Sequence, residues 1–370
     1  MEPSQAELPS FWSEMRDAVS GRTAGLILGV LAIQLLFISS YVGAFHAPTP
    51  HRVPLEVVAP APVAASVVER LDTATGHPVA ARKAASAAVA ARDVRTDRVS
   101  GALVIPPTGT TDTVYVASGG GAALAGAVEK IASAAAAAQH RTIRVVDVAP
   151  LQAGDYRGLT GFYLVIGWIV GGYLVAALLG VAAGARPATT RRAVFRLLAM
   201  IPYAVVSGAG GALVVGPGIG ALTGHTVALA AIGMLLVAAA AATTLAFQVL
   251  AGVLGIGMSV LVFVVAGNPS AGGAYQNHLL PGLWRVIGPA LINGAGTSAV
   301  RRLIYFGGAG LGPRILILAA WAAGATLLTL AASRRYLSRP IPGPAQGSGR
   351  PASASRPSAG RRRRTATLAG

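Results

Sequence analysis

The sequence predicts an α-helical polytopic membrane protein with six transmembrane helices. It also predicts an extracytoplasmic α/β domain between the first two helices and a re-entrant hairpin before the last. The 370 residues are 54% hydrophobic and 12% charged, with a mean hydropathy of +0.61, which is too apolar for a soluble enzyme of this length. Apolar windows long enough to cross a bilayer recur along the chain and are interrupted by one long polar segment, residues 46–159.

The transmembrane helices are placed by apolar windows of about 20 residues. One apolar stretch, residues 226–267, is about twice as long as a single crossing requires, so we expect a tight turn near residues 243–247 to divide it into two helices. The six expected helices lie at residues 24–45, 160–183, 197–217, two within 226–267, and 313–333.

The segment before the first helix, residues 1–23, predicts a cytoplasmic N-terminus rather than a signal peptide. It is long and net acidic, and no Ala-x-Ala cleavage site follows the apolar run, so a retained anchor is favoured over a cleaved signal. At helical spacing, Phe11 and Trp12 fall on an apolar face, whereas Glu14 and Asp17 fall on a polar one. This pattern predicts an interfacial helix over residues 11–20; an ordinary helix packed on protein is the alternative.

Residues 46–159 alternate between strand-like and helix-like patterns, so they predict a folded α/β domain rather than a linker. The expected strands are VPLEVV, SGALVIPP, DTVYVAS and TIRVVDV, and the expected helices are VAASVVERL and GAALAGAVEKIASAAAAAQH.

The distribution of charge sets the orientation. The net charge is +17, but no Asp or Glu follows Asp155, and the basic residues gather in residues 185–196, in residues 279–308 and in the tail from Arg334. By the positive-inside rule, the loop at 185–196 and both termini are cytoplasmic in the cell membrane, and the α/β domain is outside. This clustering indicates loops beside an anionic leaflet and predicts no nucleic-acid partner. The Pro/Gly/Ser-rich tail, residues 334–370, is expected to be disordered.

Several kinds of chemistry are disfavoured, and the sequence predicts no enzyme, cofactor or metal site. There is no cysteine, and the six histidines lack metal-ligand spacing. The stretch VYVASGGGAALAGAV resembles a dinucleotide fingerprint, but Leu124 occupies the third glycine position and no acid follows about 20 residues after Gly121, so a turn and helix start is favoured. Lys83 and Lys130 lie outside any P-loop pattern. The last five helices contain no carboxylate to bind a coupling proton or sodium ion.

Residues 279–308 are apolar but contain two prolines, four glycines before Tyr305 and three arginines, which makes a poor spanning helix. They predict a hairpin of two helical legs joined near residues 293–296, entering from outside and closing the outer end of a path. Broken backbone at membrane depth must be covered by protein or line a cavity. One predicted face holds Ala299, Val300, Leu303, Ile304 and Phe306, and the other holds Thr297, Ser298, Arg301, Arg302 and Tyr305.

The residues assigned to this exit hairpin are Trp284, Arg285, Arg301, Arg302 and Tyr305. Trp284 suits a membrane interface because its ring is apolar and its N–H is polar. The arginines are on the outer side, where contact with lipid headgroups or with an anionic group of a cargo would explain them. The alternative is that they only extend to water from a capping helix.

Two segments, GALVIPP and LPGLWRVIGPALINGAGTSAVRRLIYFGG, complete a pattern that resembles the type-2 ABC exporter permeases, in particular the branch of phage-infection-protein-like membrane proteins. The resemblance covers about residues 11–335. It implies a permease subunit that exports amphipathic or lipid-like substrates, is powered by a separate ATP-binding subunit, and works as a homodimer or with a similar permease. By position it implies ATPase contacts at Phe11, Trp12, Arg191, Arg192, Val194 and Phe195. The alternative is a non-transporting envelope protein, an anchor or receptor that presents the α/β domain.

Overall fold

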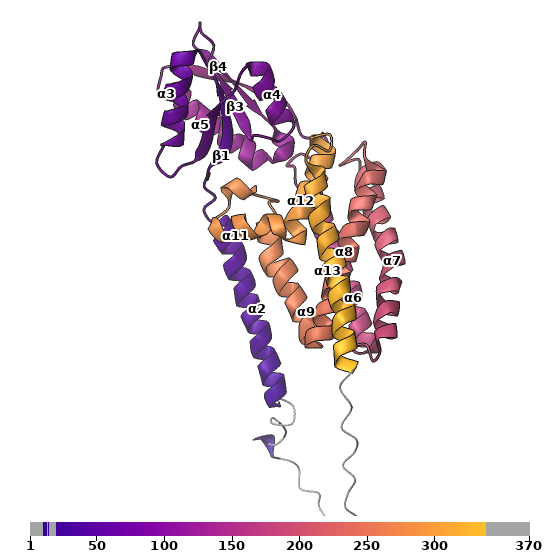
Figure 1. The fold of residues 1–370 in the computed structure, drawn as a ribbon. Helices are drawn as coiled ribbons and strands as arrows, with labels where there is room; N and C mark the ends of the chain where they lie inside the picture. Colours follow the sequence, from indigo (N-terminus) through magenta and orange to yellow (C-terminus); the bar gives the residue numbers. More distant parts are fainter. Residues whose placement is uncertain (1–9, 13, 15–19, 338–370) are drawn as a thin grey trace, which may run out of the picture.

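The computed structural model describes residues 10–12, 14 and 20–337. The molecule is elongated, with an α/β domain at one end and a bundle of long helices at the other (Figure 1). Of the predicted interfacial helix at residues 11–20, only residues 11, 12, 14 and 20 are among those described. The predicted tail begins at Arg334, but helix α13 (Leu311–Leu337) includes its first four residues; the remainder of the tail lies outside the described residues.

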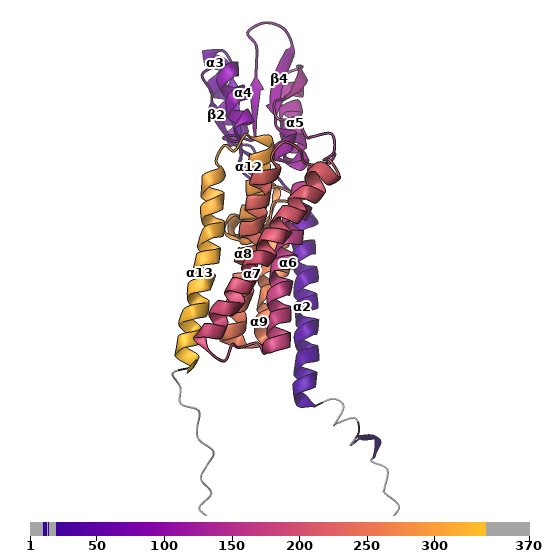
Figure 2. The same ribbon diagram turned by 90° about the vertical axis from the view of Figure 1, so that its right-hand side faces the viewer.

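Five of the described helices are long and apolar enough to cross a membrane. This number and their composition indicate a membrane-embedded protein. Helix α8 packs against α6, α7 and α13, whereas α2 and α13 lie on opposite flanks of the bundle (Figure 2). The start of α2 and the end of α13 lie at the same end of the molecule, away from the α/β domain (Figure 1). The five helices are α2 (Gly21–Phe45), α6 (Thr160–Ala183), α7 (Thr190–Leu213), α8 (Thr226–Ala251) and α13 (Leu311–Leu337).

The predicted division of residues 226–267 is wrong. Helix α8 runs without a break through residues 243–247, where the Thr243 hydroxyl donates to Ala239 O at 2.7 Å within the helix. The chain instead turns at Gly252, whose φ of +64° favours glycine. The following helix, Leu254–Ser270, is shorter and irregular: α9 (Leu254–Ser259) continues into the π-helix η3 (Val260–Gly267) and the single turn α10 (Asn268–Ser270).

Helix α7 begins seven residues before its predicted start. Thr189 caps it, because its hydroxyl oxygen accepts a hydrogen bond from the backbone N–H of Arg192 at 3.1 Å. Arg196 lies inside the helix and donates to Ala183 O, the last residue of α6, at 2.6 Å. The predicted basic loop is therefore partly helical, and it is shortened to the residues between α6 and α7. At its other end, α7 continues into the π-helix η2 (Val214–Gly218).

The α/β domain is confirmed as a folded unit with a five-stranded sheet in the order β2-β1-β3-β4-β5. Strands β3 and β4 are antiparallel and the other neighbouring pairs are parallel. All six predicted elements are present, but β2 and α4 were not expected. The elements are β1 (Val53–Val58), α3 (Ala61–Asp72), β2 (Val79–Lys83), α4 (Ala87–Arg95), β3 (Gly101–Val104), β4 (Thr111–Val116), the short 3-10 turn η1 (Ser118–Gly120), α5 (Ala122–Ala137) and β5 (Thr142–Asp147).

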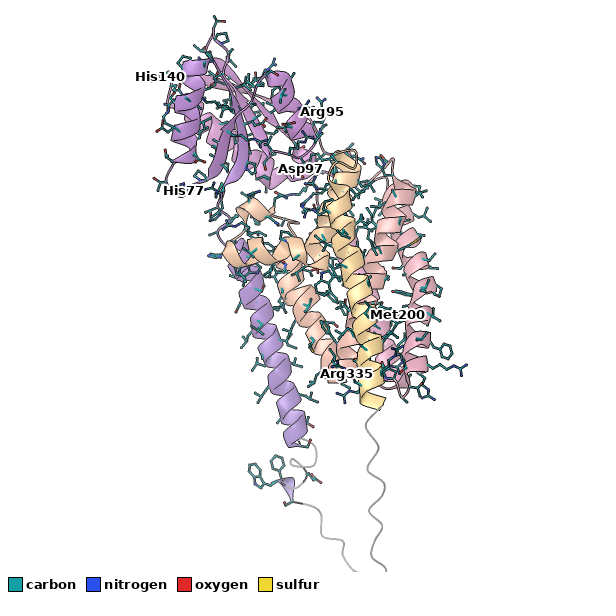
Figure 3. All side chains as sticks on the ribbon, in the orientation of Figure 1. His77, Arg95, Asp97, His140, Met200 and Arg335 are labelled. Atoms are coloured by element: carbon teal, nitrogen blue, oxygen red, sulfur yellow. The ribbon has the colours of Figure 1, made fainter. Side chains whose placement is uncertain are left out.

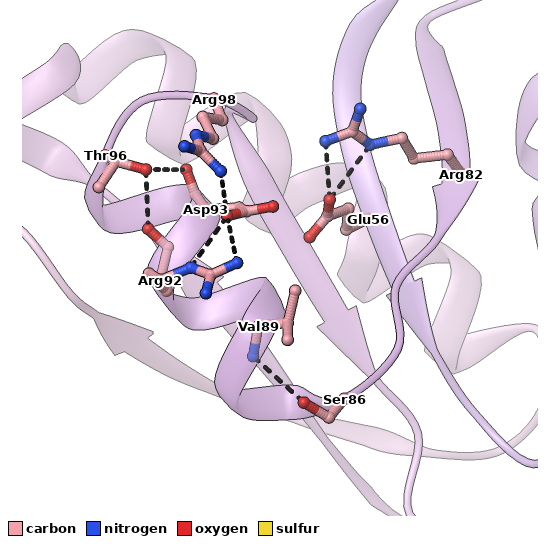
Figure 4. Close-up of polar contacts among 8 residues, drawn as sticks. All are labelled: Glu56, Arg82, Ser86, Val89, Arg92, Asp93, Thr96 and Arg98. Carbon is pink, nitrogen blue, oxygen red and sulfur yellow. Dashed lines mark hydrogen bonds and ion pairs between the residues drawn. The ribbon is translucent and has the colours of Figure 1, made fainter. Parts of the chain in front are cut away.

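Side-chain hydrogen bonds hold α4 and the turn that follows it (Figure 4). The Ser86 hydroxyl oxygen accepts from Val89 N at the start of the helix, at 3.3 Å. Near its end, the buried Asp93 pairs with Arg92 and Arg98 at 3.4 and 3.5 Å. These contacts fix the next turn, in which Asp97 has a φ of +53°.

The two helical legs of the predicted hairpin are present, but the predicted joint at residues 293–296 is wrong because these residues belong to α12 (Ile292–Tyr305). The first leg is α11 (Gly282–Ile287), preceded by the 3-10 turn η4 (Asn277–Leu279), and the chain turns at η5 (Gly288–Ala290). Gly288 is required there, because an added Cβ would lie 2.1 Å from Ser270 O. Protein covers only part of the broken backbone. Gly288 and residues 292–297 are buried, whereas α11 contains no buried residue and Ala290 is exposed, although its carbonyl accepts from Trp321 Nε1 of α13 at 2.8 Å.

Candidate functional site

The glycine-rich turn before α5 joins the α/β domain to the membrane helices. Each of its three glycines lies against one side chain from the hairpin region; the pairs are Gly119 with Tyr305, Gly120 with Phe306, and Gly121 with Gln276. Gly121 has a φ of +139°, and an added Cβ would lie only 2.0 Å from Gln276 Cδ. Gln276 Oε1 in turn accepts from Leu124 N, in the first turn of α5, at 3.0 Å. The glycines therefore allow close docking of two parts of the chain.

A second polar contact fastens the end of α12. Tyr305 donates through its hydroxyl to Asp155 Oδ2 at 2.6 Å. The other oxygen of Asp155 accepts from Thr160 N, at the start of α6, at 2.9 Å. Tyr305, which the sequence assigned to the exit hairpin, thus links α12 to α6 and holds the hairpin beneath the α/β domain.

The two adjacent arginines of α12 lie at this junction. Arg302 donates to Asp97 Oδ2 at 2.5 Å and to Ala309 O at 2.8 Å. Asp97 belongs to the α/β domain and lies at its lower edge, beside the helices (Figure 3). Arg301 donates to the carbonyls of Gly272 and Gly273 at 2.5 and 2.8 Å. Both guanidinium groups are therefore held in place by the loop and the domain around them.

A cavity of about 270 Å³ opens between the α/β domain, the loop at residues 271–278, α12 and the start of α13. Its charged lining consists of four arginines and one aspartate: Arg98, Arg301, Arg302, Arg314 and Asp97. The Nε atoms of Arg302 and Arg314 are buried and have no hydrogen-bond partner among the described residues. The cavity therefore has an excess of positive charge and unused donors, which suits an anionic ligand.

Burial shifts the pKa of two side chains that line this cavity, Asp97 and His278. Burial raises the pKa of Asp97, and the charges of Arg302, Arg301, Arg314 and His278 oppose this shift. A single carboxylate cannot balance the arginines around it at any pH at which they stay charged.

Burial also lowers the pKa of His278, and the charge of Arg285 lowers it further. Opposing these effects are the hydrogen bond between His278 Nδ1 and His51 O, at 3.1 Å, and the charge of Asp97.

The five residues assigned to the exit hairpin do not form one cluster. Arg301 and Arg302 line the cavity and Tyr305 is beside it, whereas Trp284 fastens α2 to the hairpin. Trp284 Nε1 donates to Ser40 Oγ at 3.0 Å, and an added Cβ on Gly43 would lie 2.8 Å from the Trp284 ring. Arg285 belongs to α11 and is not among the residues that line the cavity.

The predicted polar face of α12 points toward protein rather than toward water. Thr297 is 1% exposed, and its hydroxyl oxygen has no hydrogen-bond partner among the described residues. One turn earlier, Asn293 Nδ2 donates to Phe263 O at 3.0 Å and to Asn268 Oδ1 at 2.7 Å. These bonds tie α12 to the irregular helix η3 in the bundle.

The residues assigned to ATPase contact lie away from the α/β domain, either at the start of α7 or in the chain that precedes α2 (Figure 1). Arg191, Arg192, Val194 and Phe195 occupy the first turns of α7, which start away from the α/β domain (Figure 1). Phe195 is 53% exposed, and the Arg191 guanidinium lies 5.3 Å from the centre of its ring. Phe11 and Trp12 are also exposed and contact each other edge to face.

The sequence did not predict that Arg314, Asp97 and Gln276 line the cavity. Arg314 had a usable signal, since a cation inside an apolar helix is unusual. Asp97 and Gln276 had none, because their partners are distant in the sequence. Within the described ranges, no group of three or more histidine, aspartate or glutamate side chains is placed to hold a metal ion.

Comparisons with protein-family models, with curated proteins and with solved structures found no match to this chain. The function must therefore be inferred from the residues and the geometry themselves.

Proposed function

We propose that this chain is the membrane permease subunit of an ATP-driven exporter of amphipathic or lipid-like substrates. The observation that carries the proposal is the hairpin α11–α12, which does not span the bundle and is packed at its domain end beside a polar cavity. A separate subunit would supply the ATPase activity. The resemblance to type-2 ABC exporter permeases gives the same assignment.

The hairpin favours transport over a purely anchoring role. Broken helices at membrane depth are tolerated where they are buried in protein or line a cavity, and they recur at the binding sites of transporters. An anchor or receptor needs apolar helices to hold its exposed domain, but it has no need for a buried half-helix. Here Asn293 and Trp321 side chains hydrogen-bond to the irregular backbone around the hairpin.

An external energy source is consistent with the charges in the chain. No Asp or Glu follows Asp155, so the bundle lacks the carboxylates that usually bind a coupling ion. The exposed Phe195, flanked by Arg191 and Arg192, offers an apolar contact with a basic surround at the end of the bundle that is predicted to be cytoplasmic. A soluble ATPase would dock there.

The test is to purify the tagged chain from its native membranes and measure ATP hydrolysis by the complex. Phe195→Asp should abolish co-purifying ATPase activity, because it places a charge in the apolar contact. The matched control is Ile219→Asp, at a residue that is 71% exposed and follows the opposite end of α7. Absence of ATPase activity in the wild type, or equal activity in both variants, would support the anchor alternative.

The proposal includes a second permease copy. None of the apolar window of α2 is buried inside the chain, so lipid or another protein must cover it. The small-residue pair Gly167 and Gly171 of α6 could also allow two helices to pack closely, but Gly171 faces Tyr203 of α7 within the same chain. Since the chain contains no cysteine, single cysteines along α2 can be cross-linked without background. Only monomers at every position would contradict pairing through this helix.

A further inference from the structure

We propose that the cavity between the α/β domain and α12 binds the phosphate group of an anionic ligand. The name phosphate cavity is used below for this space, defined by Asp97, Ser298, Arg301, Arg302 and Arg314. Binding to it does not depend on the proposed function, whereas the assignment of the bound group as part of the transported substrate rests on that function.

The balance of charge is the first argument. Arg301, Arg302 and Arg314 line one cavity together with a single carboxylate, Asp97, which pairs with Arg302. Like charges held together in a partly desolvated space are costly unless a counter-charge joins them. A bound anion supplies that counter-charge.

Unused hydrogen-bond donors are the second argument. The Arg302 side chain is only 14% exposed; two of its nitrogens bond to protein, but its buried Nε has no partner among the described residues. The buried Nε of Arg314 is in the same situation. Buried donors without partners cost free energy, so two of them beside one cavity indicate a ligand that accepts hydrogen bonds.

The number and origin of the donors favour phosphate over carboxylate. A planar carboxylate is satisfied by a single guanidinium fork, whereas a tetrahedral phosphate has oxygens that can meet donors from several directions. Here the arginines come from two helices, α12 and α13, and the hydroxyl of Ser298 lines the same space. The fourth arginine, Arg98, already pairs with Asp93 and is not needed for binding.

The position of the cavity admits two sources of phosphate. It lies where the α/β domain meets the helix bundle, beside the first turn of the apolar helix α13, where the headgroups of a surrounding bilayer would be expected. A phospholipid headgroup or free inorganic phosphate would both fit the chemistry, and the experiment separates them.

The first experiment measures the thermal unfolding midpoint of the purified full chain in a neutral detergent. Dihexanoyl-phosphatidylglycerol, inorganic phosphate and phosphate-free dihexanoylglycerol are titrated separately. A ligand that binds only the folded protein raises the midpoint with concentration. We expect phosphatidylglycerol to raise it if the source is a lipid, inorganic phosphate alone to do so if the source is free phosphate, and dihexanoylglycerol to have no such effect.

Arg314→Gln should weaken the response by about tenfold or more in apparent Kd, because it removes a charged donor with an unused Nε. The matched control is Arg144→Gln, which removes an exposed charge from β5 of the α/β domain. Loss of affinity in Arg314→Gln with retention in Arg144→Gln supports the site. No response to either phosphate compound, or an equal response in both variants, overturns it.

A second variant, Ser298→Glu, places a carboxylate in the phosphate cavity. The attached anion should raise the unfolding midpoint without ligand and remove the response to added phosphate compounds. A lower midpoint together with a retained response would contradict the proposed site. Because these measurements need no ATPase, a failed Phe195→Asp test would leave the phosphate site standing. Unchanged binding in Arg314→Gln would reject the site but leave the proposed function untouched.

Discussion

Replacing Gly121 with alanine tests whether the glycine turn docks the α/β domain on the membrane helices. The φ of +139° at this position would cost a residue with a side chain about 1–3 kcal/mol. The new Cβ would also lie 2.0 Å from Gln276 Cδ, and relieving such overpacking costs about 1–3 kcal/mol. A total of about 3 kcal/mol would make opening of this joint more than about 100-fold more frequent.

Hydrogen exchange of the Leu124 amide in the full chain is the assay, because this N–H donates to Gln276 Oε1 across the joint. Gly121→Ala should speed its exchange by about 100-fold. The control is Gly126→Ala in the same helix, where an added Cβ meets nothing within 4 Å and should stabilise the helix by about 0.5–1 kcal/mol. Unchanged exchange in Gly121→Ala, or faster exchange in Gly126→Ala, would refute this account of the turn.

Three further predictions concern residues around the hairpin. Burial lowers the pKa of His278, so its contribution to stability is present above the ordinary value of about 6.5 and is lost as the pH falls below it. Between about pH 8 and pH 5 the wild type should therefore lose more stability than His278→Gln, and parallel pH profiles would contradict this. Asn293→Ala should lower the free energy of unfolding by about 1–3 kcal/mol in a thermal unfolding measurement, because Phe263 O and Asn268 Oδ1 lose a buried donor. An unchanged free energy of unfolding would show that these hydrogen bonds are dispensable. Trp284→Ala should speed hydrogen exchange near Ser40 in α2, and unchanged exchange there would mean that other contacts hold this helix.

The apolar pattern of the sequence predicted where the helices lie but not where one of them ends. Residues 226–267 are almost uniformly apolar, so their hydropathy gives no boundary. The predicted turn includes Thr243 and Thr244, yet both are buried within α8. The Thr243 hydroxyl donates to a carbonyl in its own helix, and the Thr244 hydroxyl accepts from Ser259. The real signal was Gly252, whose backbone conformation is visible only in the structure.

At the start of α7, the sequence predicted a loop where the structure has a helix. The arginines before residue 197 lowered the local hydropathy, so the sequence placed them in a loop. Arg196 nevertheless lies within the helix, where the end of α6 accepts its hydrogen bond. Hydropathy measures the cost of a charge but not whether a neighbouring carbonyl offsets it.

The site was predicted only in part, because its residues come together from distant positions. The sequence drew attention to Arg301 and Arg302 because the positive-inside rule predicts that they lie on the outer side. It could not pair Arg302 with Asp97, which is 205 positions away, or Gln276 with Leu124, 152 positions away. Single-sequence patterns report spacing along one element, whereas these contacts depend on how the α/β domain docks.

ATP-dependent movement of a fluorescent phosphatidylglycerol between leaflets of proteoliposomes tests the central claim most directly. The vesicles would contain this chain with its co-purified ATPase. We predict movement that requires ATP, stops in Phe195→Asp, persists in Ile219→Asp and slows in Arg314→Gln. A complex that hydrolyses ATP but moves no lipid in the wild type would contradict the account of this chain as an exporter of lipid-like substrates.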